Sequence, residues 1–312
     1  MPPMATERSV DGLITPEMCA YYAERAKNPE LGLIITEHSY VDMRGKASPF
    51  QVSVACDEAI PGLKTLADAV HGASEGIKII VQINHAGGKA RREVTGSEPL
   101  SASEAEFRRG TPSEGRSETG VARALTAEEI AEIEESFVAA ALRAKEAGFD
   151  GVEIHAAHGY LLNQFYSPLI NRRDDGYGPQ SIENRVRLHT EITSKVRAAV
   201  GSDFIVAVRF GGCDYAEGGS TIEDAAAAAP LLEAAGADLI DISGGMNGYV
   251  IKGVTEPGWF GPMSKAVKAA VGIPVMVTGG VTTLAQAEKL LEEGAADIVG
   301  IARALLKDPV LR

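Results

Sequence analysis

The sequence has few cysteines, and they do not form a metal-binding pattern. Only Cys19, Cys56 and Cys213 occur in 312 residues, and they lie far apart. A zinc site or an iron–sulfur cluster needs several closely spaced cysteines, so neither is expected. An odd and sparse count is typical of reduced thiols, and it predicts a cytoplasmic protein. Residues 1–8 also lack the apolar stretch of a signal peptide.

Positive charge and long apolar runs are scarce as well. Lys and Arg number 30 against 43 Asp and Glu, which gives a net charge of -13. Nucleic-acid binding needs clustered Lys and Arg, so a nucleic-acid partner is not expected. No apolar run approaches the roughly 20 residues of a membrane-spanning helix. No G-x-G-x-x-G follows a first strand, so a Rossmann nucleotide site has no support.

The chain does contain a repeated pattern of helix, glycine, aspartate and short apolar strand. The pattern occurs at 143–154, 231–242 and 290–301. A glycine after a helix readily adopts the left-handed conformation that ends the helix. A continuous apolar strand is typical of a parallel sheet buried on both faces. Three copies therefore predict β-α units that share one parallel sheet.

The full set of strands predicts a (β/α)8 TIM barrel, α/β in class, as a single domain over residues 1–312. Seven strands are expected at 31–37, 77–84, 151–155, 204–210, 239–243, 274–278 and 297–301. The first barrel strand is expected to be truncated, with only its end present at 1–5. Long loop insertions at 87–125 and 244–261 follow strand ends, where the active sites of such barrels form.

Polar side chains gather at the same strand ends. The most informative are Gln82, Arg209 and the group His155, His158 and Tyr160. The two histidines, with Glu153, are candidate metal ligands, but their directions differ and a third ligand is not evident. They are also candidate structural histidines, and we favour hydrogen-bond donors to a cofactor or substrate. Tyr160 is a candidate general acid, with a packing role as the alternative.

A phosphate site is expected where the last two strands end. Gly279 and Gly280 follow one strand, and Ala302 and Arg303 follow the next. Backbone N–H groups and a helix start at this place form the usual phosphate site of such barrels. The alternative is that the two glycines make only a tight turn, but Arg303 after the neighbouring strand favours phosphate.

These motifs resemble one family. The stretch HAAHGYLLNQFYSPLINRRDDGYG at 155–178 resembles the signature of the Old Yellow Enzyme family of FMN-dependent ene-reductases. Residues 181–185, 82–87, 32–37, 277–280 and 302–303 resemble the same family, in family order and across nearly the whole chain.

The resemblance implies an NAD(P)H-dependent flavin oxidoreductase that reduces activated alkenes such as enones. Flavin N5 would supply hydride, and Tyr160 would supply the proton, while His155 and His158 bind the activating oxygen. The FMN contacts would be Pro3, Met4, Ala5, His38, Gln82, Arg209, Gly279, Gly280, Ala302 and Arg303. The substrate would be a small molecule, and the chain would form a homodimer or homotetramer. A member that oxidises an amine or other donor, and a non-catalytic flavin-binding barrel, stay open as alternatives.

Overall fold

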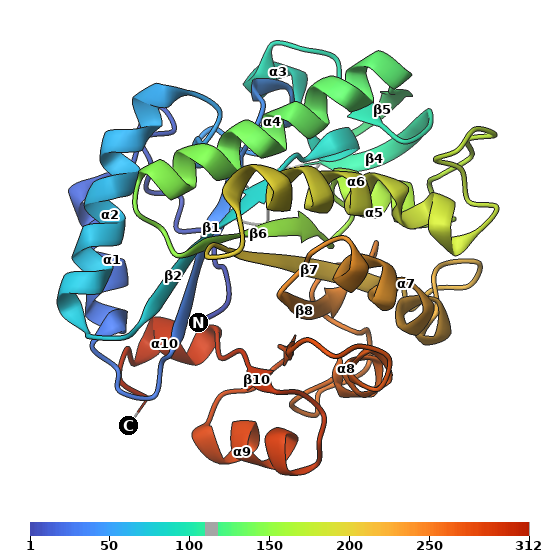
Figure 1. Cartoon of the computed structure of the whole chain (residues 1–312). Coiled ribbons are helices and arrows are strands. Elements are labelled where there is room, and N and C mark those ends of the chain that lie inside the picture. The colour runs from blue at the N-terminus through green and yellow to red at the C-terminus, as the bar shows by residue number, and fades with distance from the viewer. Residues whose placement is uncertain (110–117, 312) are drawn as a thin grey trace.

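The centre of the computed structural model, which describes residues 1–109 and 118–311, is a curled parallel sheet (Figure 1). Its strands run in the order β1-β2-β6-β7-β8-β9-β10, which is also their order along the chain, apart from the strands of an insertion. Their bounds are β1 Leu33–Tyr40, β2 Lys78–Asn84, β6 Gly151–Ala156, β7 Ile205–Cys213, β8 Leu239–Gly244, β9 Val275–Val277 and β10 Ile298–Val299. Each of the seven predicted strands is confirmed, and the parallel α/β fold with it.

The apolar character of these strands explains why they assemble. Neighbouring strands pair valine with valine, as Val81 with Val152 and Val152 with Val206. A compact cluster of Ile35, Ile80, Ala207, Leu239 and Met276 fills the space enclosed by the curled sheet. Branched side chains from several strands form such layers inside a barrel.

Helices surround the outer face of the sheet, and the helices α1, α2, α4, α6, α7 and α8 each contact the next one in that order (Figure 1). Thr126 caps α4 with a reciprocal bond to Glu129. The helices are α1 Pro16–Ala26, α2 Ile60–Ala73, α3 Arg92–Thr95, α4 Ala127–Glu146, α5 Leu161–Tyr166, α6 Ile182–Val200, α7 Ile222–Ala234, α8 Gly261–Lys268, α9 Leu284–Glu292 and α10 Arg303–Lys307, with the 3-10 turns η1 Met43–Gly45, η2 Asp57–Ala59 and η3 Gly87–Lys89.

The first residues of the chain lie next to β1. The Met1 ammonium donates to the carbonyl of Leu33 (2.7 Å), and the Ile35 amide donates to the carbonyl of Met1 (2.9 Å). Pro2 lies against Gly300, which follows β10. Residues 1–2 therefore occupy the position between the two outer strands of the sheet, where a first barrel strand would run.

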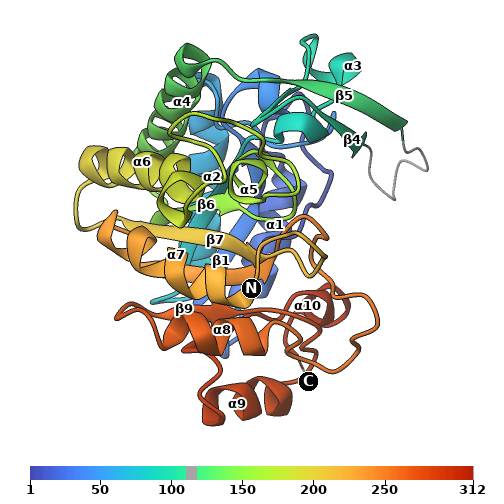
Figure 2. The same ribbon diagram turned by 90° about the vertical axis from the view of Figure 1, so that its right-hand side faces the viewer.

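The insertion predicted at 87–125 contains a small sheet of its own. It consists of β3 Leu100–Ser101, β5 Glu118–Ala124 and β4 Ala105–Arg109, paired in that order. Figure 2 shows β4 and β5 at the upper right, above α5, and β3 contacts α5. Residues 110–117 of the insertion lie outside the described residues. The insertion at 244–261 has no helix or strand between β8 and α8.

The single-domain organisation over 1–312 stays a prediction. Across residues 1–109 and 118–311, no helix is long and apolar enough to span a membrane.

Candidate active site

Three histidines and a tyrosine meet where β1 and β6 end. His38 comes from β1, His155 from β6, and His158 and Tyr160 from the turn that follows β6. The His155 ring is 5.0 Å from both the His158 and the Tyr160 rings, nearly perpendicular to each. Tyr160 stacks on His38 with the ring centres 5.6 Å apart. The residues that the sequence singled out thus form one cluster of rings.

The turn at 157–160 orients two of these rings. His158 has a φ of +59° and Gly159 a φ of +69°, so the chain passes through two left-handed residues in a row. Such a conformation is costly for a histidine, and it persists only where the surroundings hold it. Here every backbone donor and acceptor of the two residues is bonded.

The bonds that hold the turn come from three other segments. The His158 amide donates to the carbonyl of Gly244 (3.1 Å), and the Gly159 amide donates to the Asn163 side chain (2.8 Å). The Gln164 side chain donates to the carbonyl of Gly159 (2.8 Å). The ammonium of Lys89 donates to the carbonyl of His158 (2.6 Å). The turn is therefore built by the insertion, by α5 and by the end of β8 together.

His155 is neutral, and its proton is placed by the backbone. Burial, more than the nearby positive charges, lowers the pKa of His155 well below its usual value. The Ala157 amide donates to Nδ1 of His155 (3.3 Å). An imidazole nitrogen that accepts carries no proton, so the proton is on Nε2. His155 is thus a fixed donor.

His158 is neutral for the same reason, because burial lowers its pKa well below the usual value. Its Nε2 lies 2.7 Å from Oγ of Ser243. Ser243 also accepts a long contact from Arg209 (3.5 Å), which leaves the hydroxyl proton for His158. If the Ser243 hydroxyl donates to Nε2, that nitrogen carries no proton, and the proton of the neutral ring is on Nδ1. His158 is then a second donor, through Nδ1.

Tyr160 retains its proton over the whole neutral range. It lies at the N-cap of α5, and burial raises its pKa to about 12.

No three His, Cys, Asp or Glu side chains in the described ranges lie close enough to hold a metal ion, so the metal interpretation of Glu153, His155 and His158 has no geometric support.

A buried charged group lies behind the rings. Arg209 is ion-paired with Asp241 (3.0 Å), and its Nε has no hydrogen-bond partner in the described part of the chain. Gln82 donates to Glu153 (2.6 Å), which fixes the direction of its amide. Burial raises the pKa of Glu153 well above its usual value, and Asp241 raises it further. Gln82 and Arg209 are therefore held rigidly, and Arg209 retains a free donor.

The expected phosphate residues lie together at the end of β9 and at α10. Gly279 and Gly280 have φ values of +126° and +72°, in the region that favours glycine. Trp259 packs on the face of both glycines where a side chain would stand, and the Arg303 guanidinium lies 5.8 Å from its ring centre. Ala302 directly precedes α10. Glycines that admit close approach, with a cation beside them, fit a phosphate group.

Pro3, Met4 and Ala5 follow the residues that lie between β1 and β10. The segment is anchored at Thr6, whose amide (3.1 Å) and hydroxyl (2.6 Å) both donate to the Glu37 carboxylate. Glu37 directly precedes His38, so the anchor brings the segment to the strand end that carries the ring cluster. Met4 packs against the core, while Ala5 is exposed.

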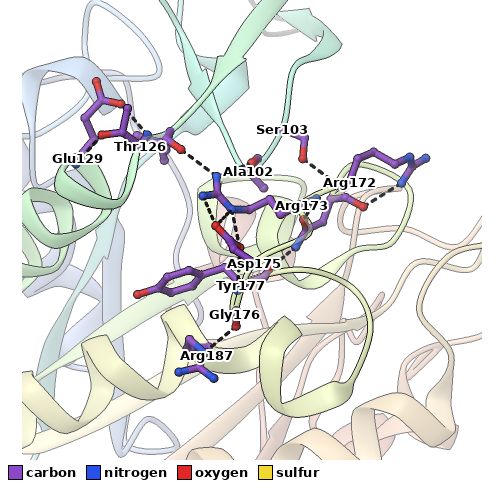
Figure 3. Close-up of polar contacts among 12 residues, drawn as sticks. Ala102, Ser103, Thr126, Glu129, Arg172, Arg173, Asp175, Gly176, Tyr177 and Arg187 are labelled. Carbon is purple, nitrogen blue, oxygen red and sulfur yellow. Dashed lines mark hydrogen bonds and ion pairs between the residues drawn. The ribbon is translucent and has the colours of Figure 1, made fainter.

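The second half of the motif at 155–178 has a structural task rather than a place in the ring cluster. Arg173 pairs with Asp175 and donates to the carbonyls of Ala102 (3.0 Å) and Leu125 (2.8 Å). Figure 3 shows Arg172 bonded to Ser103 beside it. These bonds fasten the loop after α5 to the residues that follow β3 and β5, and so they hold the insertion against this loop.

Lys89 is a positioning residue that the sequence reasoning missed. Burial lowers its pKa to about 8. Its ammonium lies 5.5 Å from the centre of the Tyr160 ring and pairs with no carboxylate in the described residues. The sequence offered little reason to select Lys89, because it simply follows the motif at 82–87. Only the fold shows that it bonds the turn that carries His158.

For the alkene reduction that the resemblance implies, we expect Lys89→Met to lower the rate by up to about 10²-fold, because a shift of the turn by an ångström misplaces His158 and Tyr160. Lys89→Arg retains a donor and should restore most of the rate. Stopped-flow kinetics of both variants, alone and combined with Tyr160→Phe, checks this. If Lys89→Met costs as much without Tyr160 as with it, Lys89 does not act through Tyr160.

The comparisons with known proteins agree with the fold. The family model described as NADH:flavin oxidoreductase / NADH oxidase family matches residues 1–312. The chain belongs to that family. An NADPH dehydrogenase of Halalkalibacterium halodurans is 37% identical over 96% of this chain and 83% of its own length.

The chain is also similar to a solved structure and to a longer relative. The Old Yellow Enzyme homologue of Zymomonas mobilis superposes with a TM-score of 0.85 at 27% identity, over 99% of this chain and 85% of that one. An NADH oxidase of Thermoanaerobacter brockii is 39% identical over 99% of this chain but 47% of its own length. The chain thus spans about half the length of that curated relative.

Proposed function

We propose that this chain is an FMN-dependent oxidoreductase that uses NAD(P)H to reduce the C=C bond of activated alkenes. The observation that carries the proposal is the pair of neutral imidazoles, His155 and His158, with the protonated Tyr160 beside them. Two donors and one acid around one space suit a substrate that gains negative charge on an oxygen and a proton on a carbon.

The residues present fit a bound flavin. Arg209 offers its unpartnered Nε, Gln82 offers an amide of fixed direction, and the Gly279–Gly280 turn with Arg303 offers a place for phosphate. His38, Pro3, Met4, Ala5 and Ala302 complete the proposed contacts. FMN would supply hydride transfer, which no side chain can perform.

The chain's own residues would do the rest. His155 would donate from Nε2 to the carbonyl oxygen of an enone, and His158 would donate to the same oxygen. Such donors stabilise the enolate as it forms. Tyr160 would give its phenolic proton to the α-carbon. The inserted sheet, fastened by Arg173, would exclude water from the site.

The experiment adds FMN to the purified chain and offers two reductants in the absence of oxygen. The proposal predicts that NADPH or NADH bleaches the bound flavin. Bleaching by an amine alone, with trimethylamine as the probe, would instead support a member that oxidises donors. A flavin that binds but responds to neither would support a non-catalytic binder. The small-molecule substrate and the homodimer or homotetramer also stay proposals.

A further inference from the structure

Trp259 has a buried hydrogen-bond donor without an acceptor. The indole N–H makes no hydrogen bond in the described part of the chain, although its nitrogen is shielded from solvent. A buried donor left unpaired costs about 1–3 kcal/mol. Tryptophan usually finds a partner for this group when it is buried, and so the missing acceptor requires an explanation.

The place of the ring indicates what the acceptor is. The indole nitrogen lies 2.9 Å from where a Cβ of Gly279 would stand, and the six-membered ring lies against Gly280 in the same way. The Gly258 amide, directly before Trp259, donates to the carbonyl of Gly279 (2.6 Å). The ring is therefore held on the glycine pair by its own backbone.

A cation stands on the same ring. The Arg303 guanidinium is 5.8 Å from the Trp259 ring centre and shows no ion pair in the described residues. It also lines a cavity of about 570 Å³ together with Thr282, Thr283 and Lys307. A group that satisfies the indole N–H at this place lies within reach of an unpaired positive charge, which favours an anionic acceptor.

We propose that Trp259 is a phosphate-binding residue, whose indole N–H donates to the phosphate of the bound cofactor beside Arg303. The inference rests on the proposed function, because it takes the phosphate to be that of FMN. It assigns a binding role to the insertion at 244–261, for which the sequence predicted only a place at a strand end.

The test measures the affinity of FMN and of riboflavin, which lacks the phosphate, for the full chain. Trp259→Phe retains an aromatic ring and removes the N–H. We expect it to weaken FMN about 10- to 100-fold, the scale of a hydrogen bond to a charged group, and to leave riboflavin unchanged. Arg303→Gln should show the same selectivity, and the double variant should lose less than the two losses combined.

Each other outcome overturns a definite part of the account. Equal FMN affinity in wild type and Trp259→Phe removes Trp259 from the phosphate site. A higher affinity means that the ring obstructs the cofactor. Equal losses for FMN and riboflavin mean that the ring only packs. If the wild type itself binds neither flavin, the proposed function fails instead.

The unaltered chain provides a second measurement in case Trp259→Phe does not fold. Trp259 is the only tryptophan of the sequence, so the emission of the protein reports on this ring alone. At constant ionic strength, inorganic phosphate should change that emission in a saturable way, at the same concentrations that displace FMN. An emission that stays constant while phosphate displaces FMN contradicts the proposal.

Discussion

Replacing His155 and His158 together by alanine is expected to lower the rate of alkene reduction by about 10³-fold or more. The loss of one oxyanion donor typically costs about 10²–10³ in rate, and the centres of the two imidazole rings lie 5.0 Å apart. The reduction of the flavin by NAD(P)H needs no such oxygen ligand, and so it should change far less. Anaerobic stopped-flow measurement of the two half-reactions separates the effects.

His71 offers a matched control for this variant. It is a half-exposed histidine on α2, where it pairs with Asp150 (2.8 Å), away from the ring cluster. His71→Ala should leave both half-reactions as in wild type. The affinity of a phenol for the oxidised flavoprotein should fall in the double variant only. An unchanged phenol affinity there would remove the two histidines from the oxygen-binding role.

Replacing Tyr160 by phenylalanine should lower alkene reduction by about 10²- to 10⁴-fold, the usual range for a lost general acid. The oxidation of NAD(P)H should persist. Because burial raises the Tyr160 pKa to about 12, the phenol stays protonated at lower pH. The wild-type rate should therefore not fall between about pH 7 and 10 through loss of this proton.

Tyr249 is the rival acid that this experiment has to exclude. Its ring centre lies 6.1 Å from that of His158, and its side chain is largely exposed. The account predicts that Tyr249→Phe reduces alkenes at nearly the wild-type rate, because its phenol is open to solvent. If the large loss follows Tyr249→Phe instead, the roles of the two tyrosines are reversed.

The sequence was sufficient to predict the sheet because its signal is local. Strands such as β2 and β8 contain short apolar runs, at 79–81 and 239–240, and each predicted strand lies within a few residues of the observed one. The α4 cap was equally local, since Thr126 and Glu129 are three residues apart. The inserted sheet was not predicted, because β4 and β5 carry charged and polar side chains along much of their length.

The site residues that the sequence predicted also have local signals, whereas the missed residues depend on long-range contacts. His155, His158 and Tyr160 are close in sequence, and a strand end brings them together. Lys89 was missed because its importance comes from a bond to His158, which lies 69 residues later in the chain. Trp259 was missed because its importance comes from its contact with the glycine turn that follows β9. A lysine beside glycines and a lone tryptophan in a loop carry no such signal. The left-handed conformation of His158 is equally invisible in a sequence.

The most direct test of the central claim mixes the NADPH-reduced enzyme with cyclohexenone in the absence of oxygen. Cyclohexenone carries the carbonyl that His155 and His158 are proposed to bind and the carbon that Tyr160 is proposed to protonate. The account predicts that the absorbance of oxidised flavin returns as cyclohexanone forms, and that it returns at least about 10²-fold more slowly in Tyr160→Phe. A wild-type flavin that stays bleached, or a variant that recovers as fast as the wild type, would contradict it.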